Sequence, residues 1–162
     1  MAPTSRKYFL DTEFVEHGDT VIPVSIGLVS ESGREYYAEY ATDWERHASA
    51  WVKEHVRPHL EGNTKPREAI RDELLAFVGD LPCEFWAYFA ATDWVVVIHT
   101  LGGLSLFPKN WRPFIMDLAW LDPGLERIRA LPIHNPKPHH ALWDARELRT
   151  RYFGLVGAGP SR

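Results

Sequence analysis

Four carboxylates and one histidine, in three short segments of the sequence, are the residues best suited to chemistry. Asp11 and Glu13 are separated by one residue, Asp93 lies near the middle of the chain, and His139 precedes Asp144 by five residues. Carboxylate oxygens are the ligands that Mg²⁺ and Mn²⁺ prefer, and two such ions can stabilise both the attacking and the leaving oxygen of a phosphodiester cleavage. This pattern predicts a two-metal nuclease.

The spacing of Asp11 and Glu13 suits a shared ion. They lie in the run from Lys7 to Phe14, whose aromatic and apolar residues favour a strand. Side chains two residues apart in a strand project from the same face, so both carboxylates can reach one ion. The alternative is a solvated strand face, and Asp93 alone is equally well explained as an acid that caps a helix or meets its dipole.

His139 is the candidate general base. Histidine titrates near neutral pH and can take the proton of an attacking water. His139 lies on a proline-rich loop before the last predicted helix, and Asp144 lies at the start of that helix. His140 is an alternative base, and either histidine could instead be an ordinary exposed or core side chain.

The composition predicts one domain. The chain has 162 residues, of which 45% are hydrophobic and 13% aromatic, enough to bury one substantial core. We expect this domain at residues 1–153, followed by a flexible Gly-rich tail at 154–162. There is no membrane-length apolar run and no signal-peptide pattern, so we expect a soluble, cytoplasmic protein. The single cysteine, Cys83, excludes an internal disulfide and a Cys-rich zinc site.

The charge balance limits the nucleic acids that the protein could bind. There are 22 acidic and 18 basic residues, and without the four candidate ligands the acids and bases are equal in number. A long duplex held on a basic surface is therefore disfavoured. A short single-stranded end, held by metal ions and stacked on aromatic side chains, fits this balance better.

The elements that must position these residues can be read from apolar spacing, turn signals and capping residues. Strands are expected at 7–14, 21–30, 34–40, 84–88 and 114–116, with the second and third forming an antiparallel hairpin. Helices are expected at 44–60, 66–78, 124–130 and 140–152, and another runs to Leu101 with Thr92 as its cap and Asp93 in its first turn. The chain therefore predicts an α/β fold with a mixed five-stranded sheet flanked by helices.

The three motifs resemble those of the DEDDh 3'-5' exonucleases of the RNase H-like superfamily. The matching segments are Phe9–Phe14, Trp86–Asp93 and His139–Arg146, and the resemblance covers nearly the whole chain. Within this group, the segments 25–29, 51–52 and 114–117 are most similar to the small bacterial polyadenylate-specific 3'-exoribonucleases AS, with RNase T and oligoribonuclease more distant. The chain departs from many members at Tyr88, Phe89 and Ala90, where they have Asn or His.

The resemblance implies an RNase H-like fold and a reaction. Asp11, Glu13, Asp93 and Asp144 would bind two Mg²⁺ or Mn²⁺ ions, and His139 would activate water. The protein would release nucleoside 5'-monophosphates from the 3' ends or overhangs of single-stranded RNA, and it would form a homodimer. Asp117 would be a structural cap and not a ligand.

The expected substrate contacts lie close to the first motif. We expect Phe14 to be the wedge against the terminal base, although core packing explains it as well, and the backbone of Thr12 to meet the terminal ribose. Glu13 and His139 complete this substrate-binding set. Trp51 is expected on the apolar face of a helix and needs no ligand to explain it.

Three other functions are consistent with parts of the sequence. Nothing in the motifs reads the 2'-hydroxyl, so a 3'-5' DNA exonuclease acting on DNA 3' ends is the first alternative. A catalytically silent nucleic-acid-binding module is the second, and the intact set of five site residues argues against it. A transition-metal hydrolase is the third, but Pro58 interrupts the helical spacing of His55 and His59 that it would need.

Overall fold

The computed structural model describes residues 5–157, and its elements alternate between one sheet and the helices around it. The strands are β1 (Arg6–His17), β2 (Thr20–Ser30), β3 (Glu35–Tyr40), β4 (Thr64–Lys65), β5 (Cys83–Ala87) and β6 (Met116–Asp117). The α-helices are α1 (Trp44–His47), α2 (Ala50–His55), α3 (Arg67–Val78), α4 (Ala91–Leu101), α5 (Glu126–Ala130) and α6 (Ala141–Val156). The 3₁₀ helices are η1 (Arg57–His59), η2 (Leu104–Leu106) and η3 (Leu118–Leu121).

The strands form one mixed sheet in the order β4-β3-β2-β1-β5-β6. β1, β2 and β3 form an antiparallel meander, while β5 pairs with β1, β6 with β5, and β4 with β3 in parallel. The predicted hairpin of the second and third strands is confirmed. The sheet has six strands where five were predicted, and the strand that was missed is β4. With only two residues, β4 is too short to show an alternation of apolar and polar residues in the sequence.

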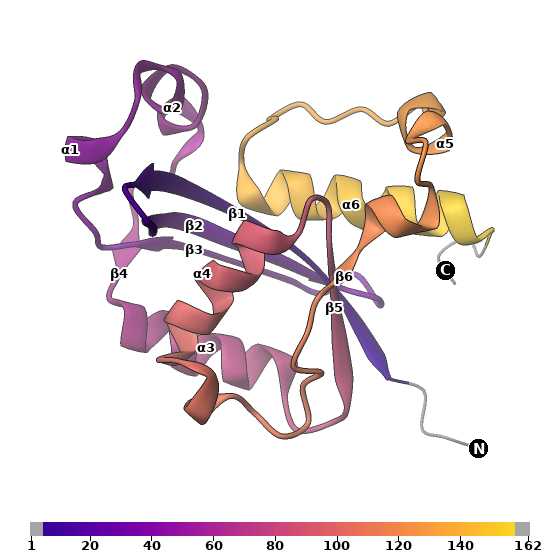
Figure 1. The fold of residues 1–162 in the computed structure, drawn as a ribbon, viewed down its shortest axis with the longest axis horizontal. Coiled ribbons are helices and arrows are strands. Elements are labelled where there is room, and N and C mark those ends of the chain that lie inside the picture. Colours follow the sequence, from indigo (N-terminus) through magenta and orange to yellow (C-terminus); the bar gives the residue numbers. More distant parts are fainter. Residues whose placement is uncertain (1–4, 158–162) are drawn as a thin grey trace.

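Two helical layers cover the sheet (Figure 1). α3 and α4 lie on one face and α6 on the other, with α5 beside α6. Because side chains alternate along a strand, β1 contributes to both layers. Tyr8 and Leu10 belong to the core cluster that includes α3 and α4, whereas Phe9 packs against Tyr152 and Phe153 of α6. The strand therefore carries apolar groups into both halves of the core.

Gly27 of β2 sets the distance between the sheet and α6. A Cβ atom at this position would lie 2.4 Å from the backbone carbon of Ala141 and 2.4 Å from the backbone nitrogen of Leu142. Only a residue without a side chain permits this approach. In the sheet, Gly27 pairs with Asp11. The start of α6 is thus held directly beside Asp11.

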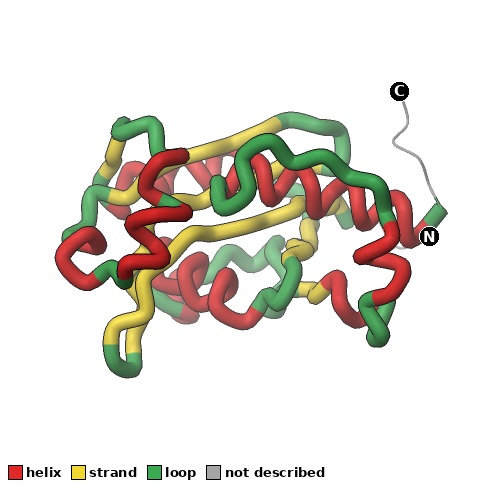
Figure 2. The backbone as a smooth tube through the Cα atoms, turned by 90° about the horizontal axis from the view of Figure 1, so that it is seen from above, coloured by secondary structure: helices red, strands yellow, loops and turns green. Residues whose placement is uncertain are grey.

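The long connection between α5 and α6 runs back along α6 (Figures 1 and 2). It contains the loop with three prolines at residues 131–138 that the sequence predicts, and it ends at His139 and His140. α6 itself continues to Val156, beyond the predicted end at Tyr152. Residues 158–162 of the predicted tail lie outside the described residues.

Two other predictions about helices are wrong. The expected helix over residues 44–60 is α1, α2 and η1, because Ala48 is extended and the Ser49 hydroxyl accepts from the Val52 N–H to begin a new helix. Thr92 lies inside α4 and does not cap it. The cap position is Ala90, whose side chain makes no capping hydrogen bond, while the predicted end at Leu101 is confirmed and Gly102 follows it in the left-handed conformation.

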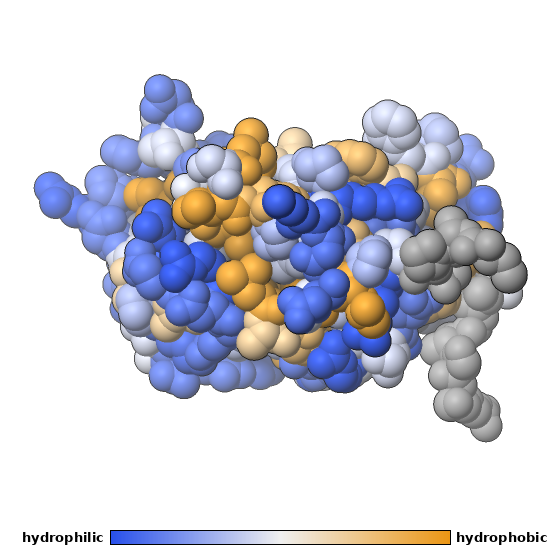
Figure 3. Space-filling view, turned by 90° about the horizontal axis from the view of Figure 1, so that it is seen from below, coloured by the Kyte–Doolittle hydropathy of each residue, from blue (hydrophilic) through white to orange (hydrophobic). Residues whose placement is uncertain are grey.

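The surface seen from below carries hydrophobic groups near the middle of the face with hydrophilic ones around them (Figure 3). Leu104 and Leu106 of η2 are among the exposed apolar side chains of the molecule. Across residues 5–157, none of the helices combines the length and the apolar character needed to cross a membrane.

Candidate active site

β1 presents the first two candidate ligands. Asp11 and Glu13 pair with Gly27 and Ser25 of β2, and a bulge follows between Glu13 and Phe14. Both carboxylates are half-buried. They follow Phe9 at intervals of two residues, so they continue the strand face that packs against α6.

Asp93 approaches from the first turn of α4. Its Oδ1 accepts hydrogen bonds from the Thr12 backbone N–H at 2.9 Å and from the Thr12 hydroxyl at 2.7 Å. The side chain is buried, as is Thr12. Thr12 thus ties the helix to β1 and holds Asp93 close enough for its charge to act on Asp11 and Glu13. The Thr12 hydroxyl thus donates to Asp93. The contact of the Thr12 backbone with a terminal ribose stays a prediction.

His139 and Asp144 come from the start of α6. His139 has a φ of 63°, in the left-handed region, and its N–H donates to Asp144 Oδ2 at 3.0 Å. Side-chain ligand atoms of Glu13, His139 and Asp144 all lie within 4.8 Å of one another, the only such group of potential metal-binding residues in the described part of the chain. A non-glycine residue in this conformation costs free energy and is often found at functional sites.

Burial raises the pKa values of all four acids, and neighbouring acids raise those of Asp11 and Glu13 further. Burial raises the pKa of Asp11 well above its usual range, and the nearby charges of Asp93, Glu13 and Asp144 raise it further. Burial, with the charges of Asp144 and Asp93, raises the pKa of Glu13 to about 8. Burial raises the pKa of Asp93 to about 6 against the opposing hydrogen bonds from Thr12, and burial also raises that of Asp144. The four acids therefore lie close enough for their negative charges to repel one another, and this repulsion makes their ionisation less favourable. We call them the acid cluster.

The donor set fits a hard divalent cation. Mg²⁺ and Mn²⁺ take oxygen ligands, and a cation among like charges would relieve the repulsion between them. The alternative site based on His55 and His59 does not form, because among the described residues no group that includes them brings ligand atoms together.

Three residues of this site were not predicted from the sequence. Glu147 lies one turn after Asp144, and its charge acts on both Asp11 and Asp144. Asn135 donates to Asp144 Oδ1 at 2.5 Å and to Glu147 Oε2 at 3.0 Å, so it fastens the proline-rich loop to α6. Arg151 donates from Nε to Glu147 Oε1 at 2.8 Å. The spacing of Asp144, Glu147 and Arg151 on one helical face was the signal available.

His139 and His140 occupy different environments. His140 is 2% exposed, its ring stacks on Tyr37 at a centroid distance of 4.4 Å, and neither ring nitrogen has a hydrogen-bond partner. Burial lowers its pKa. His139 instead lines a hollow together with Asp11 and Asp144. Of the two candidate bases, only His139 faces the acid cluster.

Two hollows meet the acid cluster from different sides. One, of about 270 Å³, is lined by Asp11, Tyr88, Pro138, His139, Asp144, Glu147, Leu148 and Arg151. The other, of about 490 Å³, is lined by Glu13, Phe14, Val15, Glu16, His47, Ser49, Trp51, Val52 and Val56. Phe14 is half-buried, so it both packs on the core and borders this second hollow. Asp11 and Asp144 therefore border one hollow and Glu13 borders the other.

Trp51 differs from its predicted role. It is 49% exposed, stacks on His55 and meets the His139 ring edge-on at a centroid distance of 4.8 Å. α2 therefore contacts the candidate base directly. Asp117 agrees with its prediction as a cap, because its Oδ1 accepts from the Ala119 N–H at 2.9 Å at the start of η3.

Comparison with known proteins gives relatives by sequence and by structure. The chain is 36% identical to the 3'-5' exoribonuclease Rv2179c of Mycobacterium tuberculosis strain H37Rv and to the 3'-5' exoribonuclease MT2234.1 of strain CDC 1551. Each alignment covers 93% of this chain and 92% of the relative. No family model matches the sequence.

The fold is also similar to that of exonuclease I. One structure of that enzyme superposes with a TM-score of 0.68 at 13% identity, covering 94% of this chain and 40% of exonuclease I. A zinc-bound complex of Escherichia coli exonuclease I with single-stranded DNA gives a TM-score of 0.67 at 13% identity, covering 96% of this chain and 41% of that one. The chain thus spans less than half of exonuclease I, and the likeness establishes an α/β, RNase H-like fold. With its two mycobacterial relatives matched over almost their full length, the chain belongs to the family of these 3'-5' exoribonucleases.

Proposed function

We propose that this protein is a metal-dependent 3'-5' exoribonuclease that shortens single-stranded RNA ends or 3' overhangs. Its family membership supports the reaction, since both relatives are named 3'-5' exoribonucleases. The observation that carries the proposal is the cluster of four acids beside His139, in which burial and mutual repulsion raise the carboxyl pKa values. We assign the protein to the DEDDh type and to the group of small polyadenylate-specific 3'-exoribonucleases AS, on the order of its motifs.

In this proposal Asp11, Glu13, Asp93 and Asp144 hold two Mg²⁺ or Mn²⁺ ions. When bound, the ions would neutralise charge on the scissile phosphate and lower the pKa of the attacking water. The His139 imidazole takes the proton of that water, and its ring is positioned by contact with Trp51 and by the backbone bond to Asp144. In-line attack then releases a nucleoside 5'-monophosphate.

The rest of the site holds the substrate. Phe14 and Trp51 border the hollow next to Glu13, where the terminal base can lie against aromatic rings. Thr12 and Glu13 stay in the proposed set of substrate contacts. A homodimer, as the resemblance implies, and a cytoplasmic location are also part of the proposal.

The choice between RNA and DNA is tested with matched substrates. The single-stranded DNA in the E. coli complex belongs to exonuclease I, which shares only the fold with this chain. We expect 5'-labelled single-stranded RNA to give a ladder that shortens from the 3' end with Mg²⁺ or Mn²⁺, and the matched DNA to be degraded more slowly. Faster degradation of the DNA would make the protein a DNA exonuclease, and intact substrates with bound nucleic acid would make it a binding module.

A further inference from the structure

Two aromatic residues at the end of β5 form a pair that the proposed reaction does not use. The rings of Tyr88 and Phe89 lie 4.3 Å apart between centroids, inclined at 39°. Phe89 is 62% exposed, and Tyr88 is half-buried. Most of the Phe89 ring stays in water, so the ring contributes little to the stability of the core.

The backbone holds Phe89 in this exposed position at a cost. Its φ of 55° is in the left-handed region, which is unfavourable for a bulky residue. The Asp117 carboxylate compensates, accepting from the Phe89 N–H at 3.2 Å and from the Ala90 N–H at 3.0 Å. Asp117 also caps η3, so the turn is fastened to the neighbouring strand β6. The conformation is therefore fixed by the fold before any ligand binds.

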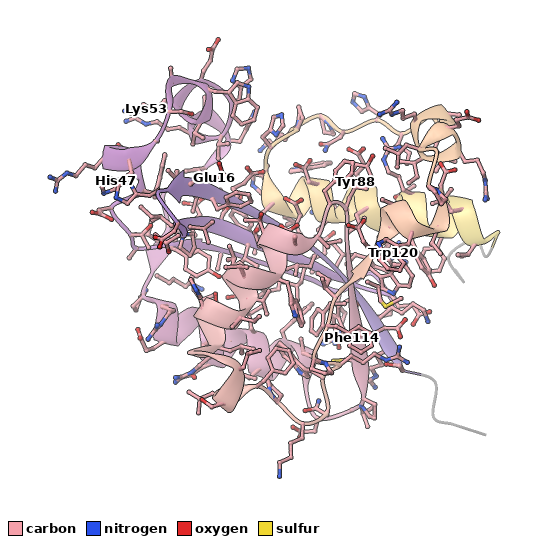
Figure 4. The ribbon with its side chains drawn as sticks, in the orientation of Figure 1. Glu16, His47, Lys53, Tyr88, Phe114 and Trp120 are labelled. Carbon is pink, nitrogen blue, oxygen red and sulfur yellow. The ribbon has the colours of Figure 1, made fainter. Side chains whose placement is uncertain are left out.

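The pair lies at the edge of the acid cluster. Tyr88 lines the same hollow as Asp11, His139 and Asp144. Phe89 extends this aromatic surface outward, and α4, which carries Asp93, begins two residues later. In the side-chain view Tyr88 lies near α6 (Figure 4), and it shares the hollow with Leu148 and Arg151 of that helix. A strand of nucleotides that reaches the acids through this hollow passes Tyr88, and the exposed Phe89 ring lies against Tyr88.

We propose that Tyr88 and Phe89 form a stacking platform for a nucleobase near the 3' end of the single-stranded substrate. This inference rests on the proposed function. Stacking on an aromatic ring accepts any base, because every base has a π-face, and it requires that the base is unpaired. The platform would thus select single-stranded ends without reading sequence.

The test is binding of fluorescein-labelled oligoadenylate RNA, measured by anisotropy with Ca²⁺ in place of Mg²⁺. We expect Phe89→Ala to weaken binding by about 5- to 100-fold, the range for loss of one base–aromatic stack, and Phe89→Tyr to restore it. Phe114→Ala is the matched control, because Phe114 is 51% exposed but lies before β6 and away from Tyr88, which lines the hollow (Figure 4). Melting temperatures of all three variants verify that they are folded.

A series of RNAs with a single abasic nucleotide identifies the stacked base. At one position the missing base should weaken binding to the wild type as much as Phe89→Ala does, with no further loss in the variant. Equal binding of wild type and Phe89→Ala, or equal effects of Phe89→Ala on every abasic RNA, would overturn the platform. Loss of a dimer in Phe89→Ala by light scattering, with RNA binding unchanged, would make the pair a contact between copies and would also overturn it.

Hydrolysis separates this inference from the proposed function. If the wild type degrades RNA and Phe89→Ala binds equally well, only the platform fails. If the wild type binds RNA through Phe89 and degrades none with Mg²⁺ or Mn²⁺, the proposed function fails and the platform stands. A wild type that neither binds nor degrades RNA would overturn both.

Discussion

At the scale of single residues, the proposed reaction depends on five side chains that come from three separate segments of the sequence. Each of these residues taken alone has an ordinary structural explanation, so the candidate set was predicted from the order of the three motifs together and from their resemblance to a known family. The residues around them were not predictable in this way. Asn135 and Glu147 acquire their contacts with Asp144 only once the proline-rich loop folds back along α6. Polar loop residues such as Asn135 are common, and the sequence does not say which one turns inward.

The acid cluster predicts how the protein binds metal. Asp11→Asn removes one charged oxygen ligand, so we expect its affinity for Mn²⁺ in calorimetric titration to fall by about 100-fold, at least as much as loss of a supporting residue costs in other metal sites. Asp19→Asn is the matched control, since Asp19 is exposed in the turn after β1. Wild-type affinity in Asp11→Asn would remove Asp11 from the ligand set.

At the scale of elements, the long strands and the hairpin were predictable because their apolar residues are locally periodic. The helices between residues 44 and 60 were not, because the apolar spacing continues through Ser49 although the helix does not. The start of α4 was also missed, since the turn before the helix is held by Asp117, which is more than 25 residues away in sequence and accepts from the N–H groups of Phe89 and Ala90. Long-range contacts of this kind override a local capping signal.

The packing of α6 on β2 predicts a sensitive position at Gly27. Gly27→Ala introduces a Cβ 2.4 Å from the α6 backbone, so the helix start has to move. We expect the free energy of unfolding to fall by about 1–3 kcal/mol, as for other overpacked cores, and exonuclease activity to fall by a larger factor than this stability loss explains. Chemical denaturation and RNA time courses measure the two effects.

Gly33→Ala provides the comparison for this experiment. Gly33 also lies beside β2, but a Cβ there meets nothing within 4 Å. Its φ of 89° is unfavourable for alanine, so the substitution strains only the backbone. It should lower stability while leaving the activity of the folded fraction unchanged. Equal activity per folded molecule in both variants would show that the position of the α6 start does not matter for the reaction.

At the scale of the whole molecule, the repulsion between the acids lowers the stability of the metal-free fold, and bound cations would remove this repulsion. The fold holds acids whose pKa values are raised, so the folded protein binds protons more tightly than the unfolded chain does. Stability contributed in this way is complete below the unfolded pKa, near 4, and is lost as the pH rises through the folded pKa, which for Glu13 is about 8. The metal-free protein should therefore become less stable between these two values.

This linkage predicts the pH dependence of melting. In EDTA, we expect the melting temperature to fall between about pH 5 and about pH 8, and Mn²⁺ to raise it more at the higher pH, because the ions bind the ionised acids. Asp11→Asn should melt at a higher temperature than the wild type in EDTA at the higher pH, since one repelling charge is gone. A metal-free protein equally stable across this range would contradict the repulsion within the acid cluster.

The most direct measurement of the central claim is a time course on 5'-labelled single-stranded RNA with Mn²⁺, Mg²⁺ or EDTA. We predict shortening from the 3' end with either metal and none in EDTA. His139→Ala should be slower by about 100- to 10,000-fold, the usual contribution of a general base, while His134→Ala, an exposed histidine on the same loop, should match the wild type. Degradation that persists in EDTA, or a His139→Ala variant as active as the wild type, would contradict a metal-dependent site built around His139.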